Sequence, residues 1–233
     1  MKLFLIKTII GLFCLVLLFS CSDSSTDPAD NNQENTITDY DCNVYKTVTI
    51  GTQVWMAENL RATHYRDGSR IPNVTDNVAW TNLQTGGRCY YDNDSSGYAD
   101  LYGALYNGYA ITDTNLTPKG WHMPTEEDWQ ILIDYLGGIT IAGGKMKEAD
   151  TVHWKSPNTN ADNSSGFLAL AAGYRSGNSP CPSVFIREKA YFWTSSLFSS
   201  DRAYTICLNH NSAGITKASD QFKWGFSVRC VKD

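Results

Sequence analysis

Apolar residues at helical spacing predict an amphipathic helix near the middle of the chain. Four of them fall at offsets of zero, three, four and seven: Trp129, Leu132, Ile133 and Leu136. Thr125 precedes three acidic residues and suits the N-cap, and Asp128 has the position to complete a short capping box. The glycine pair at 137–138 ends the predicted helix, because glycine readily adopts the left-handed conformation wanted there.

The other elements are predicted to be short. Alternating or continuous apolar runs predict strands over 45–51, 53–56, 167–170, 191–194, 203–208 and 225–231. A second, shorter helix is predicted over 141–149. Two short helices combined with hairpins indicate an α+β domain in which antiparallel strands carry long loops.

The N-terminal residues have the layout of an export signal. Lys2 and Lys7 precede an apolar run over 9–19, which is shorter than the roughly 20 residues of a membrane span. Leu-Phe-Ser then leads into Cys21, as in a bacterial lipobox, whose cysteine becomes the lipid-modified first residue. The alternative is a plain secreted protein that is cleaved nearby. We therefore expect a signal peptide over 1–20 and an outer-membrane lipoprotein, facing the periplasm or the cell surface.

The next segment predicts a spacer in front of one folded domain. Residues 21–38 are polar, acidic and poor in apolar side chains, so they are expected to stay disordered. Residues 39–233 then fit a single domain. The net charge of −5 argues against a nucleic-acid partner, which needs a basic surface. The 12% of aromatic residues suits carbohydrate or protein recognition better, although most of these rings are expected in the core.

Five blocks of the sequence resemble, in order, the Fibrobacter succinogenes major paralogous domain: 45–60, 102–107, 120–125, 173–175 and 225–233. The resemblance implies a C-type-lectin-like fold, in a group that also contains the formylglycine-generating sulfatase-modifying enzymes. In such a fold the first and last strands pair, two helices flank the sheet, and a long loop region carries ligands. Members of the family are lipoproteins and secreted proteins of Bacteroidetes and Fibrobacter.

The resemblance also implies a disulfide pattern. In the family a cysteine at the position of Cys89 accompanies the one at Cys230, and Cys181 with Cys207 is then expected near the hairpins. Cys42 stands where the family has glycine, which makes it the expected odd thiol. A Cys42–Cys230 bridge is the rival pairing, because both residues flank strands that should be neighbours.

Residues 91–103 partly match a calcium-binding loop. Four oxygen-bearing residues occupy the first, third, fifth and ninth ligand positions: Asp92, Asp94, Ser96 and Asp100. Gly97 stands at the sharp turn, but Gly103 replaces the glutamate expected at position twelve. The alternative is an Asx-rich turn without metal. We therefore expect no cofactor, with calcium in this loop as the alternative.

The loop over 153–163 is the second candidate ligand site. Its candidate contacts are Trp154, Asn158, Asn160 and Asp162. Pro157 and Asn158 partly match the sugar-binding motif of C-type lectins, but Ser156 stands where that motif has a carboxylate or amide. The alternative is a loop that Trp154 simply packs against the core.

No catalytic constellation stands out. His122 lies close to the acidic residues 126–128, but a zinc-protease helix would carry a second histidine one turn away. The copper-binding cysteine pair of the sulfatase-modifying oxidases is not recognisable either. We therefore expect a non-catalytic domain that binds an extracellular glycan or protein. The alternatives are a structural or adhesive envelope component and, third, an oxidase of that kind.

Overall fold

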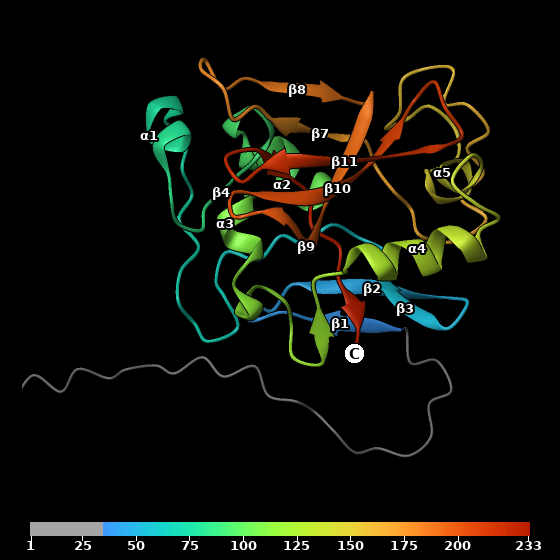
Figure 1. Cartoon of the computed structure of the whole chain (residues 1–233), viewed down its shortest axis with the longest axis horizontal. Coiled ribbons are helices and arrows are strands. Elements are labelled where there is room, and N and C mark those ends of the chain that lie inside the picture. The colour runs from blue at the N-terminus through green and yellow to red at the C-terminus, as the bar shows by residue number, and fades with distance from the viewer. Residues whose placement is uncertain (1–34) are drawn as a thin grey trace, which may run out of the picture. The chain divides into compact units, whose positions relative to one another are not determined.

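The computed structural model describes residues 35–233, and their strands form two sheets (Figure 1). The smaller sheet has the order β1-β2-β3-β13-β6. Its strands are β1 (Thr36–Thr38), β2 (Val44–Ile50), β3 (Gln53–Met56), β13 (Val231–Lys232) and β6 (Trp121–His122). The larger sheet has the order β11-β10-β9-β7-β12-β5-β4, and β8 pairs with β7. Its strands are β4 (Arg88–Cys89), β5 (Leu105–Asn107), β7 (Ala172–Arg175), β8 (Ser183–Ile186), β9 (Lys189–Ser199), β10 (Arg202–Asn209), β11 (Ile215–Gln221) and β12 (Gly225–Phe226). The prediction of an α+β fold is confirmed.

The predicted capped helix is confirmed, but the described residues contain more helices than the two that the sequence predicts. The α-helices of the described residues are α1 (Asn77–Asn82), α2 (Ser95–Tyr102), α3 (Gly108–Ile111), α4 (Glu126–Tyr135) and α5 (Ala142–Met146), with 3-10 turns η1 (Tyr91–Asn93) and η2 (Thr114–Leu116). Thr125 and Asp128 form the expected capping box of α4. The three unpredicted helices are short and begin at side-chain caps, which a search for apolar periodicity passes over. Among residues 35–233, no helix has the length and apolar character that a membrane span requires.

Two of the predicted strands differ from the observed ones. Residues 167–170 are not a strand: Leu168 has φ 51°, and the carbonyls of Phe167 and Leu168 accept hydrogen bonds from the buried guanidinium of Arg229. Residues 225–231 form two strands instead of one, because Gly225 and Phe226 pair with β5 in the larger sheet whereas Val231 pairs with β3 in the smaller sheet. The chain thus passes from one sheet to the other between these strands.

Helix α4 packs between the two sheets. Figure 1 shows it beside the blue strands of the smaller sheet and below the orange and red strands of the larger sheet. Trp129 on α4 is fully buried, with its ring centroid 4.9 Å from that of Trp55 on β3 and 5.6 Å from that of Phe192 on β9. Offset aromatic pairs at these distances stabilise a core beyond their buried area. This packing fixes the start of α4, and with it the site described below.

The folded part begins earlier than the sequence indicated. Thr36–Thr38 were placed in the disordered spacer, but they form β1 and pair antiparallel with β2. The rest of the predicted spacer, the signal peptide and Cys21 lie outside the described residues.

The predicted disulfides are wrong for this structure. Cys89, Cys181, Cys207 and Cys230 are all buried free thiols. Cys89 and Cys230 belong to different apolar clusters, and Cys207 lies in β10 whereas Cys181 packs in the same cluster as Cys89. The rival Cys42–Cys230 bridge is excluded as well, and Cys42 is not among these free thiols.

Candidate functional site

The short strand pair β6–β13 brings a histidine and a distant carboxylate together. His122 pairs with Val231 in the ladder, and the Asp233 backbone N–H donates to the carbonyl of Gly120 at 3.1 Å. As a result the Asp233 carboxylate lies 2.7 Å from Nδ1 of His122. These two residues are 111 positions apart in the sequence, so the contact is a product of the sheet.

The start of α4 supplies the second partner of His122. Nε2 of the ring lies 3.3 Å from Oδ2 of Asp128, which also accepts from the backbone N–H and the hydroxyl of Thr125. Burial would raise the pKa of the Asp128 carboxyl, but the hydrogen bonds from Thr125 and His122 outweigh it and hold the pKa below its usual value. His122 is therefore held between two carboxylates.

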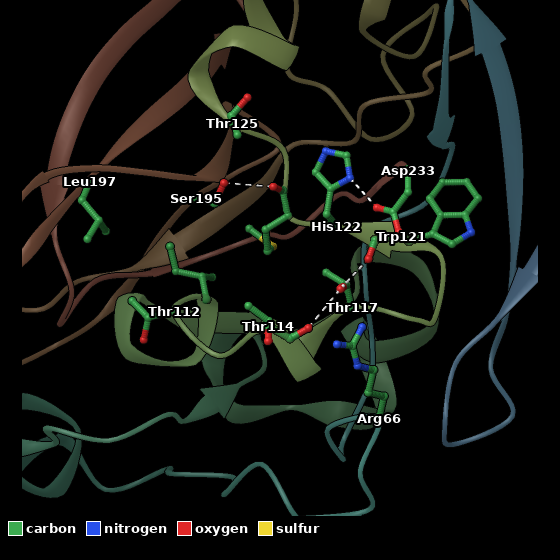
Figure 2. Close-up of a pocket in the computed structure, with 12 residues that line it drawn as sticks. Arg66, Thr112, Thr114, Thr117, Trp121, His122, Thr125, Ser195, Leu197 and Asp233 are labelled. Atoms are coloured by element: carbon green, nitrogen blue, oxygen red, sulfur yellow. Dashed lines mark hydrogen bonds and ion pairs between the residues drawn. The ribbon is translucent and has the colours of Figure 1, made fainter.

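A cavity of about 490 Å³ opens beside this histidine (Figure 2). Its lining comes from the α3–η2 segment, β6, the start of α4, β9, the C-terminal residue and one arginine: Ile111, Thr112, Thr114, Thr117, Trp121, His122, Met123, Thr125, Ser195, Leu197, Asp233 and Arg66. The volume lies within the range of roughly 300–1,000 Å³ in which proteins bind small molecules. A neighbouring hollow of about 580 Å³ is wider but is lined mainly by polar and charged side chains: Thr125, Glu126, Glu127, Gln130, Ser196 and Lys217.

Hydrogen bonds tie the walls of the cavity to one another. Ser195 on β9 donates its backbone N–H to the carbonyl of Pro124 and its hydroxyl to the carbonyl of Met123, at 2.9 and 3.0 Å. Thr117 donates its hydroxyl to the carbonyl of Trp121 at 2.8 Å. Thr112 donates to a carbonyl within its own turn at 2.8 Å. Since the protons of these three hydroxyls are used in bonds to carbonyls, their oxygens can act only as acceptors toward any further partner.

The predicted calcium residues do not form one cluster. Asp94 is the N-cap of α2 and accepts from the Gly97 backbone N–H and the Ser96 hydroxyl. Asp100 lies within the helix and lines a separate hollow of about 220 Å³. Residues 95–102 are therefore helical where a calcium loop would be wound around the ion, and Asp92 lies before the helix in η1. Within residues 35–233 no cluster of three or more metal-binding side chains is found.

The predicted ligand loop is divided between the core and the surface. Trp154 is fully buried and donates Nε1–H to the carbonyl of Ala169 at 2.9 Å. Asn158 is buried and donates to the carbonyl of Glu148, whereas Asn160 and Asp162 are exposed. None of the four lines the cavity beside His122. The packed-loop alternative describes this segment better.

Sequence reasoning missed most of the cavity. The sequence pattern indicates His122 and Thr125 as parts of a helix start and of a family block, and Asp233 only as the last residue of another block. It gives no indication of a role for Arg66 or Ser195. The block 120–125 contains four of the lining residues, so it carries a signal for the pocket as well as for the family.

Comparison with known proteins supports the family. The sequence model of the Fibrobacter succinogenes major domain family matches residues 48–232. No curated protein and no solved structure matches the chain significantly. The match spans most of the chain and nearly all of its folded part, and it ends beside Asp233. The chain belongs to the Fibrobacter succinogenes major domain family.

Proposed function

We propose that the protein is a non-catalytic binding protein of the cell envelope, whose cavity beside His122 holds a sugar unit of an extracellular glycan. The observation that carries this proposal is the hydrogen bonding of the wall hydroxyls. Thr112, Thr117 and Ser195 each donate to a backbone carbonyl, so their oxygens keep only acceptor capacity. A sugar brings many O–H donors, so it complements such a wall.

The apolar part of the lining completes the match. Ile111, Met123 and Leu197 supply aliphatic surface, and Leu197 is 55% exposed at the rim. Sugar rings have C–H faces that pack against apolar side chains while their hydroxyls bind at the edges. Sites of this mixed character are typical of small-molecule recognition.

The absence of catalysis is part of the proposal. Both ring nitrogens of His122 face carboxylate oxygens, so neither is left to accept a proton from a ligand. The hydroxyl of Ser195 is the serine nucleophile that the wall could offer, but it donates to the carbonyl of Met123. This geometry favours holding a ligand over transforming it.

The cellular setting and the finer fold class are proposed with the function. A lipid on Cys21 would tether the domain to the outer membrane, and replacing Cys21 with alanine should move the protein from the membrane to the soluble fraction. The antiparallel pairing of β3 near the start with β13 at the end supports a C-type-lectin-like arrangement. A wild-type protein without lipid would rule out the tether.

A blocked cavity tests the binding proposal. Thr114 is an exposed wall residue, and Thr114→Trp places a large ring in the cavity. Thr216→Trp, at an exposed position of β11 outside the cavity, is the matched control. In a panel of neutral and acidic oligosaccharides, a ligand at one hundred times its Kd should add about 2.7 kcal/mol to the stability of wild type and the control, but not to that of Thr114→Trp.

The competing proposal is a structural or adhesive component. Leu197 and Phe198 are 55% and 57% exposed on β9, which gives this hypothesis an apolar surface. If no oligosaccharide of the panel raises the stability of wild type or of either variant, the carbohydrate proposal is overturned and this one is favoured.

A further inference from the structure

Arg66 places an exposed cation on the wall of the cavity, next in sequence to the Asp67 carboxylate, with whose charge it interacts. Its backbone N–H donates to the carbonyl of Asn115 at 2.7 Å, and its Nε donates to the amide oxygen of the same residue at 2.9 Å. The arginine is thereby held on η2 through its backbone and through Nε of its side chain. Its two terminal nitrogens have no hydrogen-bond partner in residues 35–233, and no ion pair of that region includes Arg66.

The same cavity is also lined by a carboxylate, that of Asp233. Figure 2 shows Arg66 below Thr117, with Asp233 and His122 above it. The Asp233 side chain is 60% exposed, and only one of its oxygens faces His122. The lining thus combines N–H donors on Arg66, hydroxyl oxygens that can accept, and a carboxylate acceptor on Asp233.

We infer that the sugar unit held in this cavity is a uronic acid, with its carboxylate on Arg66 and its hydroxyls directed to the wall and to Asp233. This inference rests on the proposed function. A guanidinium presents a planar pair of N–H donors that matches the two oxygens of a carboxylate. Asp233 would repel a second carboxylate, so the site selects one acidic group in one orientation.

The geometry also explains why the acidic chain could still bind an acidic ligand. The net charge is −5, which disfavours polyanions in general. A single anchored arginine beside apolar walls favours one carboxylate at one place without a basic surface. Binding should therefore weaken with added salt only modestly.

Calorimetric titration of the mature protein tests the inference. The probes are oligomers of galacturonate, mannuronate and glucuronate, each beside its uncharged methyl ester, with a neutral and a sulfated oligosaccharide. Arg66→Gln removes the charge and Arg66→Lys keeps the charge without the planar fork. Arg70→Gln, a neighbouring exposed arginine outside the cavity, is the control.

At least one free acid should bind on the order of tenfold more tightly than its ester, as expected for a charge-assisted contact. Arg66→Gln should remove that preference, Arg66→Lys should restore it only in part, and Arg70→Gln should keep it. Equal binding of acid and ester, a preference unchanged in Arg66→Gln, or a stronger Arg66-dependent preference for the sulfated probe would overturn the inference while leaving a sugar site. No binding of any probe would overturn the proposed function as well.

Discussion

The buried ammonium of Lys147 makes stability depend on pH in a direction that can be measured. Lys147 is fully buried, and its Nζ donates to the carbonyls of Thr159, Asn209 and Ser212 at 3.1, 3.1 and 2.9 Å. No carboxylate forms an ion pair with it in the described part of the chain. Burial lowers the pKa of Lys147 to about 8, because the charged form is the one that loses most by leaving water.

The sign of the effect follows from proton counting. Below pH 8 the ammonium is charged in the folded and unfolded states alike, and burying the charge costs free energy. Between pH 8 and the ordinary lysine value near 10.5, the unfolded state binds more protons, so the free energy of unfolding rises with pH. Each pH unit in that window contributes about 1.4 kcal/mol, so about 2 kcal/mol accumulates by pH 9.5.

Replacing Lys147 with methionine isolates this contribution. Tyrosines and cysteines titrate at alkaline pH in both proteins, and their effects cancel in the difference between wild type and variant. Urea unfolding followed by tryptophan fluorescence should show that wild type gains about 2 kcal/mol relative to Lys147→Met between pH 7.5 and 9.5. Lys145→Met, on the same helix but partly exposed, should show no such change.

A constant or shrinking difference would refute the reasoning. It would mean that the three carbonyls compensate the ammonium fully, so that the pKa of Lys147 in the folded state is not lowered. The Lys147 ammonium would then be stabilised by the carbonyls of Thr159, Asn209 and Ser212 as well as it is by water.

Three further predictions concern the core, a backbone position with positive φ and the Asp128 carboxylate. Trp154→Ala should lower the free energy of unfolding by about 3–5 kcal/mol in thermal melts, because a fully buried ring leaves a cavity; unchanged stability would contradict its place in the core. Gly173→Ala should lose about 3 kcal/mol or more or fail to fold, because its φ is 63° and a Cβ would lie 2.4 Å from the carbonyl oxygen of Val184. Gly138→Ala, with φ 100° and open space, should lose only about 1–2 kcal/mol, and equal losses would refute the steric argument. Asp128→Asn should cost most near neutral pH and progressively less in acid unfolding, because the stabilisation from a lowered carboxyl pKa is present above the unfolded value and is lost as pH falls through the folded value; a pH-independent cost would contradict it.

The sequence predicts those parts of the fold that local patterns specify. The stripe through Trp129 and the Thr125–Asp128 capping box predict α4 almost to the residue, because cap and apolar face act within one helix. Phe167 and Leu168 look like a strand by composition, yet their carbonyls serve Arg229, which lies about sixty residues further on. A hydrogen bond from a distant arginine to a carbonyl cannot be predicted from the local pattern of apolar and polar residues.

Turn chemistry is the intermediate case. Asp94, Ser96 and Gly97 carry the oxygen atoms and the glycine of a metal loop, and the same residues also satisfy the cap of a helix. The spacing alone does not separate the two uses, since an N-cap and a calcium ligand both require a short side chain with an acceptor oxygen. The backbone decides between them, because the carboxylate that accepts from the Gly97 N–H begins α2.

The candidate site shows why a correct local interpretation can still be incomplete. His122 precedes a helix start, as the pattern indicated, but the strand pair β6–β13 also sets its ring against Asp233. Arg66 and Ser195 reach the same cavity through Asn115 and Met123, contacts that span 49 and 72 residues. A pocket assembled by such contacts has no spacing to detect in the sequence. The chemistry of the pocket can be inferred only after each donor and acceptor has been assigned to its partner. Among the described residues this leaves the two terminal nitrogens of Arg66 without a hydrogen-bond partner.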